Sequence, residues 1–140
     1  MAEEWAERSD SWGLFDGCLA AIDGWLCTIE KPSDVENPSD FFSGHYQKYG
    51  INVQALCDAN LRIIYISVAA NGSTNDCRAF RRLKKLRSWL EKLPKGFFIL
   101  GDNAYSIANN LLIPFSGANK HITENDTYNF FYLNCELGLR

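Results

Sequence analysis

A run of alternating polar and apolar residues and a run rich in β-branched residues stand on either side of a short turn and predict a β-hairpin. Tyr49–Cys57 alternates polar and apolar residues, Asp58–Asn60 is a tight turn, and Leu61–Val68 is the second run. An amphipathic pattern over Arg78–Leu93 predicts a helix, and the continuously apolar Gly96–Gly101 predicts a buried strand. A hairpin followed by a helical crossover to a buried strand predicts an α/β fold, a mixed sheet with helices packed on it.

The remaining segments are assigned from composition and pattern. Cys18–Ile29 reads as a strand pair or as one long bent strand around Asp23-Gly24. Glu30–Gly44 contains a stretch rich in proline, serine and acidic residues, which predicts a loop. Ala104–Leu112 is expected to be a short helix, and Tyr128–Arg140 fits a helix or a strand.

The start and the buried face of the long helix are also predicted. Ala69–Asp76 is expected to be a turn in which Ser73 or Thr74 caps the helix. The apolar helix positions recur at three- and four-residue spacing and define one buried face: Ala79, Phe80, Leu83, Leu86, Trp89, Leu90 and Leu93. We therefore expect Trp89 to lie in the core.

Composition bounds the class of protein. At 140 residues, 46% of them hydrophobic, the chain is long enough for one folded domain with its own core. The net charge of −3 means that any contact with nucleic acid must come from a local patch. Residues 78–95 hold eight of the 14 lysines and arginines. This basic run fits a surface that tracks phosphates, and it equally fits a solvated outer face of a helix.

The cysteines and the N-terminus exclude other classes. The five cysteines are scattered without a C-x-x-C pair, and there are two histidines, so a structural zinc site is not expected. We expect reduced, mostly buried thiols, and His45 and His121 in loops or at the surface. The acidic N-terminus lacks the features of a signal peptide, and no segment reaches the ~20 apolar residues of a membrane span. An intracellular protein, nuclear or cytoplasmic and without a membrane partner, is expected.

Two acidic residues each follow an apolar run: Asp23 after Leu19–Ile22 and Asp102 after Phe97–Gly101. The element order matches the front two-thirds of a ribonuclease-H-like fold, in which the first strand and the strand after the helix are parallel neighbours. That arrangement places Asp23 beside Asp102, and paired carboxylates can hold divalent cations. The alternatives are a simple turn at Asp23-Gly24 and helix caps at Asp102 and at Asp76.

Four ordered blocks resemble the DDE superfamily endonuclease domain of Harbinger-type transposases. They are Ala21–Gly24, Gly44–Asp58, Gly72–Asp76 with Asn75 and Cys77 in place of the family's histidine and serine, and Gly101–Tyr105 followed by Leu111–Ser116. The resemblance covers roughly residues 17–140. It implies that Asp23 and Asp102 are catalytic, and that Asp23, Asp76 and Asp102 are ligands of a divalent cation, Mg²⁺ or Mn²⁺. It also implies a DNA substrate whose phosphodiester bond is hydrolysed to free a 3′-OH, and a DNA-binding partner protein.

The resemblance is incomplete at both ends. The family's third acidic residue, a glutamate, is expected just beyond Arg140, and the nearest substitute, Glu136, is out of phase with it. We therefore expect a polar lead-in over residues 1–16 and a nuclease domain over 17–140 that is incomplete at its C-terminus. Weak or absent DNA cleavage follows as an expectation, because one carboxylate fewer leaves a cation under-coordinated. The rival interpretations are a non-catalytic interaction module and a pseudogene remnant.

Overall fold

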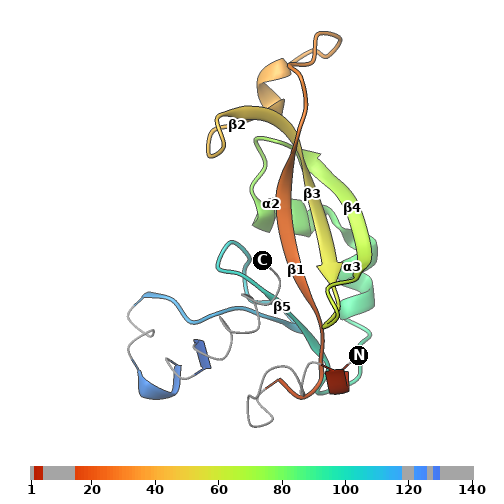
Figure 1. The fold of residues 1–140 in the computed structure, drawn as a ribbon, viewed down its shortest axis with the longest axis vertical. Helices are drawn as coiled ribbons and strands as arrows, with labels where there is room; N and C mark the ends of the chain where they lie inside the picture. The colour runs from red at the N-terminus through yellow and green to blue at the C-terminus, as the bar shows by residue number, and fades with distance from the viewer. Residues whose placement is uncertain (1, 5–14, 118–121, 126–127, 130–140) are drawn as a thin grey trace.

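The computed structural model describes residues 2–4, 15–117, 122–125 and 128–129 of the 140-residue chain (Figure 1). It is a mixed α/β fold built on one six-stranded mixed sheet. The elements in chain order are β1 (Cys18–Thr28), the 3₁₀ helix η1 (Pro38–Phe41), β2 (Phe42–Ser43), β3 (Lys48–Cys57), β4 (Ile63–Asn71), α2 (Asp76–Arg82), α3 (Lys84–Leu90), β5 (Phe98–Gly101) and β6 (Leu111–Leu112). The predicted α/β class and mixed sheet are confirmed.

The sheet combines antiparallel and parallel pairing around β1. β1 pairs with β3 in antiparallel register and with β5 in parallel register. β4 and the short β2 are antiparallel to β3, and β6 is parallel to β5. The predicted hairpin over residues 49–68 is thus present, and Cys18–Thr28 is one continuous strand. β4 continues to Asn71, so the turn predicted from Ala69 begins later than expected.

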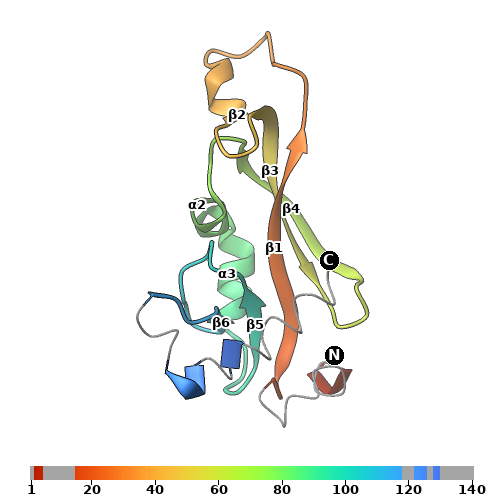
Figure 2. The ribbon, with the colours of Figure 1, turned by 60° about the vertical axis from the view of Figure 1, so that its left-hand side comes forward.

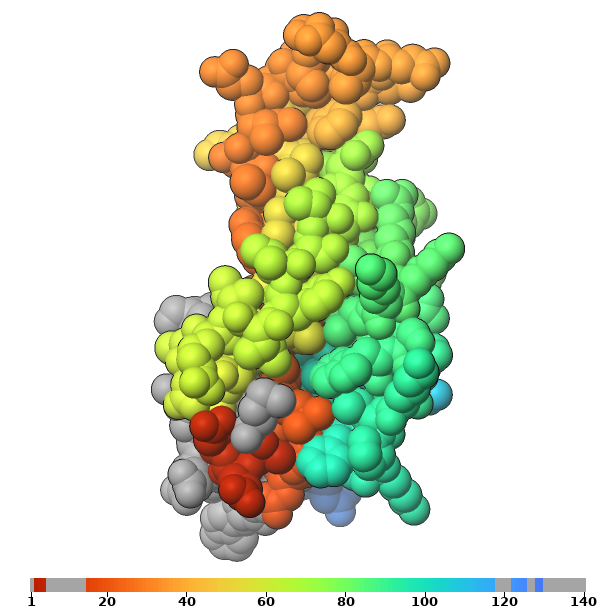
Figure 3. All heavy atoms as spheres, turned by 90° about the vertical axis from the view of Figure 1, so that its right-hand side faces the viewer, coloured from red at the N-terminus to blue at the C-terminus, as the bar shows by residue number. Residues whose placement is uncertain are grey.

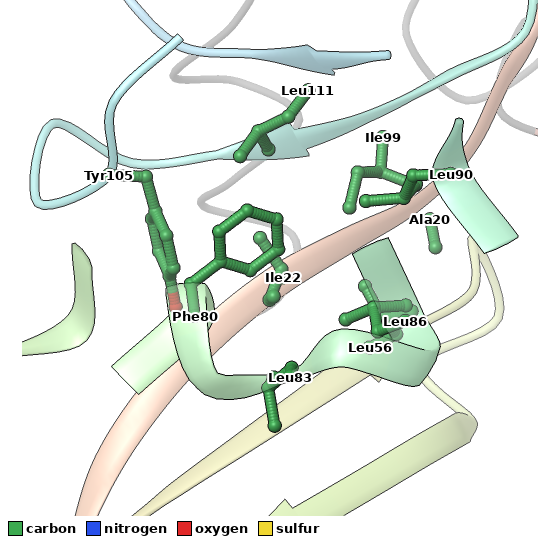
Figure 4. Close-up of a cluster of buried hydrophobic side chains, with 10 residues drawn as sticks. All are labelled: Ala20, Ile22, Leu56, Phe80, Leu83, Leu86, Leu90, Ile99, Tyr105 and Leu111. Carbon is green, nitrogen blue, oxygen red and sulfur yellow. The ribbon is translucent and has the colours of Figure 1, made fainter. Parts of the chain in front are cut away.

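Helices α2 and α3 pack on one face of the sheet (Figure 2). The main core forms between this face and the helices, where side chains from β1, β3 and β5 meet those of the helices (Figure 4). Its buried members are Ala20, Ile22, Leu56, Phe80, Leu83, Leu86, Leu90, Ile99, Tyr105 and Leu111. A second, smaller cluster joins Phe15, Cys18, Ala21, Ala59 and Leu100. Burial of these apolar side chains is the main term that stabilises the sheet against the helices.

The single helix predicted over Arg78–Leu93 is wrong, because the helix is interrupted at Leu83. Leu83 has φ −78° and ψ 65°, and its backbone N–H donates to the carbonyl of Phe80, three residues earlier. The helical residues end at Leu90. The apolar spacing predicted most of the buried face, since Ala79, Phe80, Leu83, Leu86 and Leu90 are buried. Spacing alone does not reveal the break, because a tightened turn keeps the same residues on the core side.

Trp89 is not a core residue, contrary to the prediction. Its side chain is 41% exposed and lies at the rim of a shallow apolar groove of about 280 Å³ between α3 and β4. Leu86 and Leu90 already occupy the core side of α3. The buried face predicted from the apolar spacing therefore wrongly included Trp89 of this seven-residue helix.

The short helix predicted over Ala104–Leu112 is also wrong. The backbone after β5 makes turns and then forms β6. Asp102 begins the turn, because its side-chain Oδ1 accepts a hydrogen bond from the N–H of Ala104 at 2.9 Å. Asn110 ends it in the left-handed region with φ 62°, and the Asn110 side chain donates to the carbonyl of Phe97. These side-chain hydrogen bonds compete with a helix, as is typical of aspartate and asparagine.

The predictions for the loop over Glu30–Gly44, the cysteines and the histidines were right only in part. The loop predicted over Glu30–Gly44 contains η1 and β2. Cys18 is buried, Cys57 and Cys77 are half-buried and Cys27 is exposed, so the expectation of mostly buried thiols is wrong for these four described cysteines, although none of them is in a disulfide. His45 lies exposed in a loop, as predicted. Cys135, Glu136, His121 and most of the segment Tyr128–Arg140 lie outside the described residues.

Candidate functional site

A cavity of about 660 Å³ opens at the middle of β1 and holds all three acidic residues singled out in the sequence. Asp23 enters it from β1, Asp76 from the first turn of α2, and Asp102 from the end of β5. The loop after β2 and the segment that leads into α2 supply the other walls, among them Gly44, His45 and Thr74. The topology therefore brings three carboxylates far apart in sequence to one concave site.

Asp23 and Asp102 are neighbours by strand register. The last pair of the parallel ladder between β1 and β5 is Ile22 with Gly101, and each aspartate is the next residue along its chain. Asp23 also pairs with Ala55 of β3, so it lies within a strand. The alternative that Asp23-Gly24 is a simple turn is therefore wrong, and the predicted parallel arrangement of the two strands is confirmed.

Asp76 is held by two buried amide side chains from β3. Its Oδ1 accepts a hydrogen bond from the Nδ2 of Asn52 at 2.8 Å and another from the Nε2 of Gln54 at 2.8 Å. Asn75, rather than Ser73 or Thr74, is the N-cap of α2, since its side chain accepts from the N–H of Arg78. The alternative that Asp76 is only a helix cap is therefore wrong. Its carboxylate is turned toward the sheet and the cavity.

A buried tyrosine completes this network. The hydroxyl of Tyr105 donates to the Oε1 of Gln54 at 2.6 Å, and the ring packs edge to face against Phe80 (Figure 4). Burial, together with the nearby charges of Asp76, Asp23 and Asp102, raises the pKa of Tyr105 well above its usual value. The hydroxyl is consequently protonated at neutral pH.

Gly24 allows this close packing between β1 and α2. A Cβ at this position would overlap the Oδ1 of Asp76 and the Nε2 of Gln54. Gly24 is also directly paired with Gln54 across the β1–β3 ladder. The glycine is therefore needed for the approach of the carboxylate to the strand rather than for a turn.

Sequence reasoning missed Asn52, Gln54 and Tyr105. Asn52 and Gln54 are two residues apart on one strand, and therefore point to the face of β3 that also carries the core residue Leu56. Their exposed fractions are only 7% and 0%. Two amides on the core-facing side of a strand were the available signal, because buried polar groups require partners.

The donor set fits a hard divalent cation, because carboxylate oxygens are the ligands that Mg²⁺ and Mn²⁺ prefer. Within residues 2–4, 15–117, 122–125 and 128–129, however, no three acidic, histidine or cysteine side chains are gathered tightly enough to hold a metal ion as they stand. Successive residues of a strand point to opposite faces of the sheet, and on β1 it is Gly24, the residue after Asp23, that faces Asp76. The three carboxylates share a cavity without forming a preassembled cluster.

Helices α2 and α3 carry a strong positive charge close to this acidic cavity. Segment 76–95 contains eight basic and two acidic residues, a net charge of +6 in a chain whose total is −3. The six cations on the two helices are Arg78, Arg81, Arg82, Lys84, Lys85 and Arg87. In the part of the chain that the structure describes, none of them forms a salt bridge with a carboxylate.

Comparison with protein families gives one informative match. The model of the family described as DDE superfamily endonuclease matches residues 22–130, which include Asp23, Asp76 and Asp102. Searches of the curated proteins and of the solved structures give no match. Among the described residues, no helix is long and apolar enough to cross a membrane.

Proposed function

The chain belongs to the DDE superfamily endonucleases, and from this premise we propose that it is a divalent-metal-dependent DNA endonuclease domain of transposase origin. The observation that supports the proposal most directly is the shared cavity of Asp23, Asp76 and Asp102. The reaction would be the hydrolysis of a DNA phosphodiester bond that leaves a free 3′-OH. A nuclear or cytoplasmic location is part of the same proposal.

Each acidic residue has a proposed role. A bound Mg²⁺ or Mn²⁺ would supply Lewis-acid activation of the phosphate and of a water molecule. Asp23 and Asp102, which follow paired residues on adjacent parallel strands, and Asp76, at the start of α2, would hold the cation. The rigid sheet positions the first two carboxylates, because both continue directly from the paired residues Ile22 and Gly101.

The finer assignments of fold and subfamily are proposed as well. The strands are ordered β4-β3-β1-β5-β6. Neighbours among the first three are antiparallel, and β5 and β6 run parallel to β1. This arrangement supports a ribonuclease-H-like domain over residues 17–140. The four sequence blocks support a Harbinger-type relationship. The short helix predicted over Ala104–Leu112 lends no support, since turns and β6 take its place.

DNA would be held by the basic surface, defined here as the six cations of α2 and α3. Arg78 lies two residues after Asp76, so the surface begins at the rim of the acidic cavity. Lysines and arginines that neutralise phosphates release counterions and give most of the sequence-independent affinity. A positive helix beside an acidic metal site would offset the repulsion between DNA and the carboxylates.

We propose that cleavage by this chain is weak. The three carboxylates are not preassembled among the described residues, and Mg²⁺ is bound weakly by one or two protein carboxylates. The experiment is a titration of purified chain with MnCl₂ and MgCl₂ on supercoiled plasmid, with isothermal titration calorimetry of the same samples. Slow nicking and Mn²⁺ binding in the wild type, both abolished by Asp102→Ala and retained by Glu30→Gln, are expected. Equal nicking by wild type and Asp102→Ala would overturn the proposal.

A second candidate, a non-catalytic interaction module, is favoured by one specific observation. β4 exposes Ile63, Ile66 and Val68 by 59%, 58% and 65% as it crosses one side of the molecule (Figure 3). Large exposed apolar patches often mark protein interfaces, and a DNA-binding protein is the proposed partner. A correctly folded chain that binds no Mn²⁺ and cuts no DNA would favour this candidate over the enzyme.

A further inference from the structure

We propose that Tyr105, Gln54 and Asn52 form a directed hydrogen-bond chain that positions Asp76, with one carboxylate oxygen bound to the protein and the other left for a cation. The role toward the cation rests on the proposed function. The positioning itself rests on the hydrogen bonds of the described residues alone. We call these three residues the positioning chain.

The direction of the chain begins at Tyr105. Its hydroxyl is protonated and 2.6 Å from the Oε1 of Gln54, so it donates there and fixes which end of the amide faces it. The amide nitrogen of Gln54 must then point away from Tyr105. This nitrogen has two hydrogens, and the structure gives it two acceptors: the Oδ1 of Asn52 at 2.9 Å and the Oδ1 of Asp76 at 2.8 Å.

Asn52 continues the same direction. Because its Oδ1 accepts from Gln54, its amide nitrogen faces the other way and donates to the Oδ1 of Asp76 at 2.8 Å and to the carbonyl of Thr74 at 3.2 Å. Every amide hydrogen of Asn52 and Gln54 therefore has an acceptor. A flipped Gln54 would instead set its Oε1 against the Oδ1 of Asn52 and the Oδ1 of Asp76, two contacts between acceptors with no hydrogen between them.

The consequence falls on Asp76. Its Oδ1 receives two amide donors, which use both of its lone pairs. Within the described part of the chain, no hydrogen bond reaches its Oδ2, while Asp76 lines the cavity beside Asp23 and Asp102. A single available oxygen on a fixed carboxylate suits monodentate binding of a small cation.

The burial of the positioning chain argues against a purely structural role for its three polar side chains. Gln54, Tyr105 and Asn52 are 0%, 4% and 7% exposed and adjoin a core of leucine, isoleucine and phenylalanine. A buried polar network often stabilises no more than well-packed apolar residues of similar volume, and a half-satisfied one costs more. Groups that orient a metal ligand are a recognised reason for such networks, and their loss typically weakens metal binding about 10- to 100-fold.

The test compares Tyr105→Phe with Tyr49→Phe. The first variant removes only the hydroxyl that starts the positioning chain, and the second removes a tyrosine hydroxyl on β3 beside Phe42. Two readouts are taken on the purified chain: Mn²⁺ affinity by calorimetry, and the side-chain amide resonances of Gln54 and Asn52 by NMR with their exchange rates. Thermal unfolding of each variant shows whether the fold is kept.

We expect Tyr105→Phe to weaken Mn²⁺ binding about tenfold and to speed the exchange of the Gln54 amide, while Tyr49→Phe changes neither. Unchanged Gln54 exchange in Tyr105→Phe would overturn the positioning chain. Altered exchange with unchanged Mn²⁺ affinity would overturn its role toward the cation. If the wild type binds no Mn²⁺, the proposed function fails. Slow Gln54 exchange in the wild type that is lost in Tyr105→Phe would still support the positioning of Asp76.

Discussion

Ile22 of β1 lies opposite Gly101 of β5 in the last pair of their parallel ladder, and each is followed by an aspartate. This register places Asp23 and Asp102 at one level of the sheet without any contact between their side chains being required. The backbone alone thus specifies where the two carboxylates stand. The fold is therefore expected to survive substitutions that change only these two side chains.

Asp23→Asn and Asp102→Asn should each weaken Mn²⁺ binding by more than the roughly 10- to 100-fold typical of a lost supporting residue, because each removes a proposed ligand. In Asp102→Asn the new side chain retains an oxygen that can accept from the N–H of Ala104, so the turn after β5 is kept. Calorimetry measures the affinity and circular dichroism the fold. Wild-type affinity in both variants would exclude Asp23 and Asp102 as ligands.

Asp76→Asn tests the roles of the two carboxylate oxygens of Asp76 separately. The amide oxygen of the introduced asparagine can still accept from Asn52 and Gln54, while its nitrogen takes the place of the cavity-facing oxygen. We expect a change in unfolding free energy within about 1 kcal/mol, the size of an ordinary hydrogen bond, but loss of Mn²⁺ binding. Urea denaturation and calorimetry on one preparation measure both. A large loss of stability would contradict the expectation that the amide keeps both hydrogen bonds, and retained Mn²⁺ binding would exclude Asp76 as a ligand.

Gly24→Ala should disturb the same carboxylate from the opposite side. The added methyl would overlap the Oδ1 of Asp76 and the Nε2 of Gln54, so we expect a destabilisation of about 1–3 kcal/mol, as for overpacked sites. Gly44→Ala is the matched control, because it also borders the cavity and its Cβ would meet nothing within 4 Å. Urea denaturation of the two variants is the measurement. Equal stability of both would show that β1 and α2 can separate at no cost.

The sequence predicted the parts of the fold that depend on periodicity and order. The period-two pattern of Tyr49–Cys57 and the apolar run before Asp102 follow from side-chain burial, which is written locally in the sequence. The parallel pairing of β1 with β5 was expected from the order of the elements, which matches a ribonuclease-H-like fold. What it missed depends on local hydrogen bonds. The turn after Asp102 and the break at Leu83 leave the apolar spacing unchanged, so a pattern of hydrophobicity does not detect them.

The residues of the candidate site also fall into those that the sequence identified and those that it missed. Asp23 and Asp102 were identified because each follows an apolar run, and Asp76 through the resemblance of Gly72–Asp76 to a block of the family. Gln54 and Tyr105, 51 residues apart, meet only in the folded chain. The segments around Gln54 and Tyr105 carry no local pattern that indicates the hydrogen bond between these two side chains. They also do not indicate that turns replace the helix predicted over Ala104–Leu112. Tertiary contacts of this kind override local propensity.

The turn between β3 and β4 should make stability depend on pH. Asp58 is 1% exposed, and its carboxylate accepts hydrogen bonds from the N–H groups of Asn60 and Arg62 and from the Arg62 guanidinium. Burial alone would raise the pKa of Asp58, but these hydrogen bonds and the positive charge of Arg62 outweigh it and lower the pKa.

A lowered folded-state pKa means that the carboxylate stabilises the fold above its unfolded pKa, near about 3.9, and that this contribution is lost as the pH falls through the folded value. Asp58→Asn should therefore have a lower urea midpoint than the wild type at pH 7, with the difference narrowing below about pH 4. Asp34→Asn, in the loop after β1, is the control. A difference that stays constant from pH 7 down to about pH 3 would contradict the assignment.

The basic surface supplies the last prediction, since its two interpretations differ in salt dependence. If α2 and α3 contact phosphates, Arg81→Gln with Arg82→Gln should weaken binding to a short DNA duplex and reduce the slope of log affinity against log salt by about 0.9 for each phosphate that is no longer neutralised. The double change Lys31→Gln with Lys48→Gln removes the same charge elsewhere and should leave the slope nearly unchanged. Fluorescence anisotropy over a range of KCl concentrations measures both. Identical slopes for the two double variants would assign the helix cations to solvation, because net charge alone would then account for the affinity.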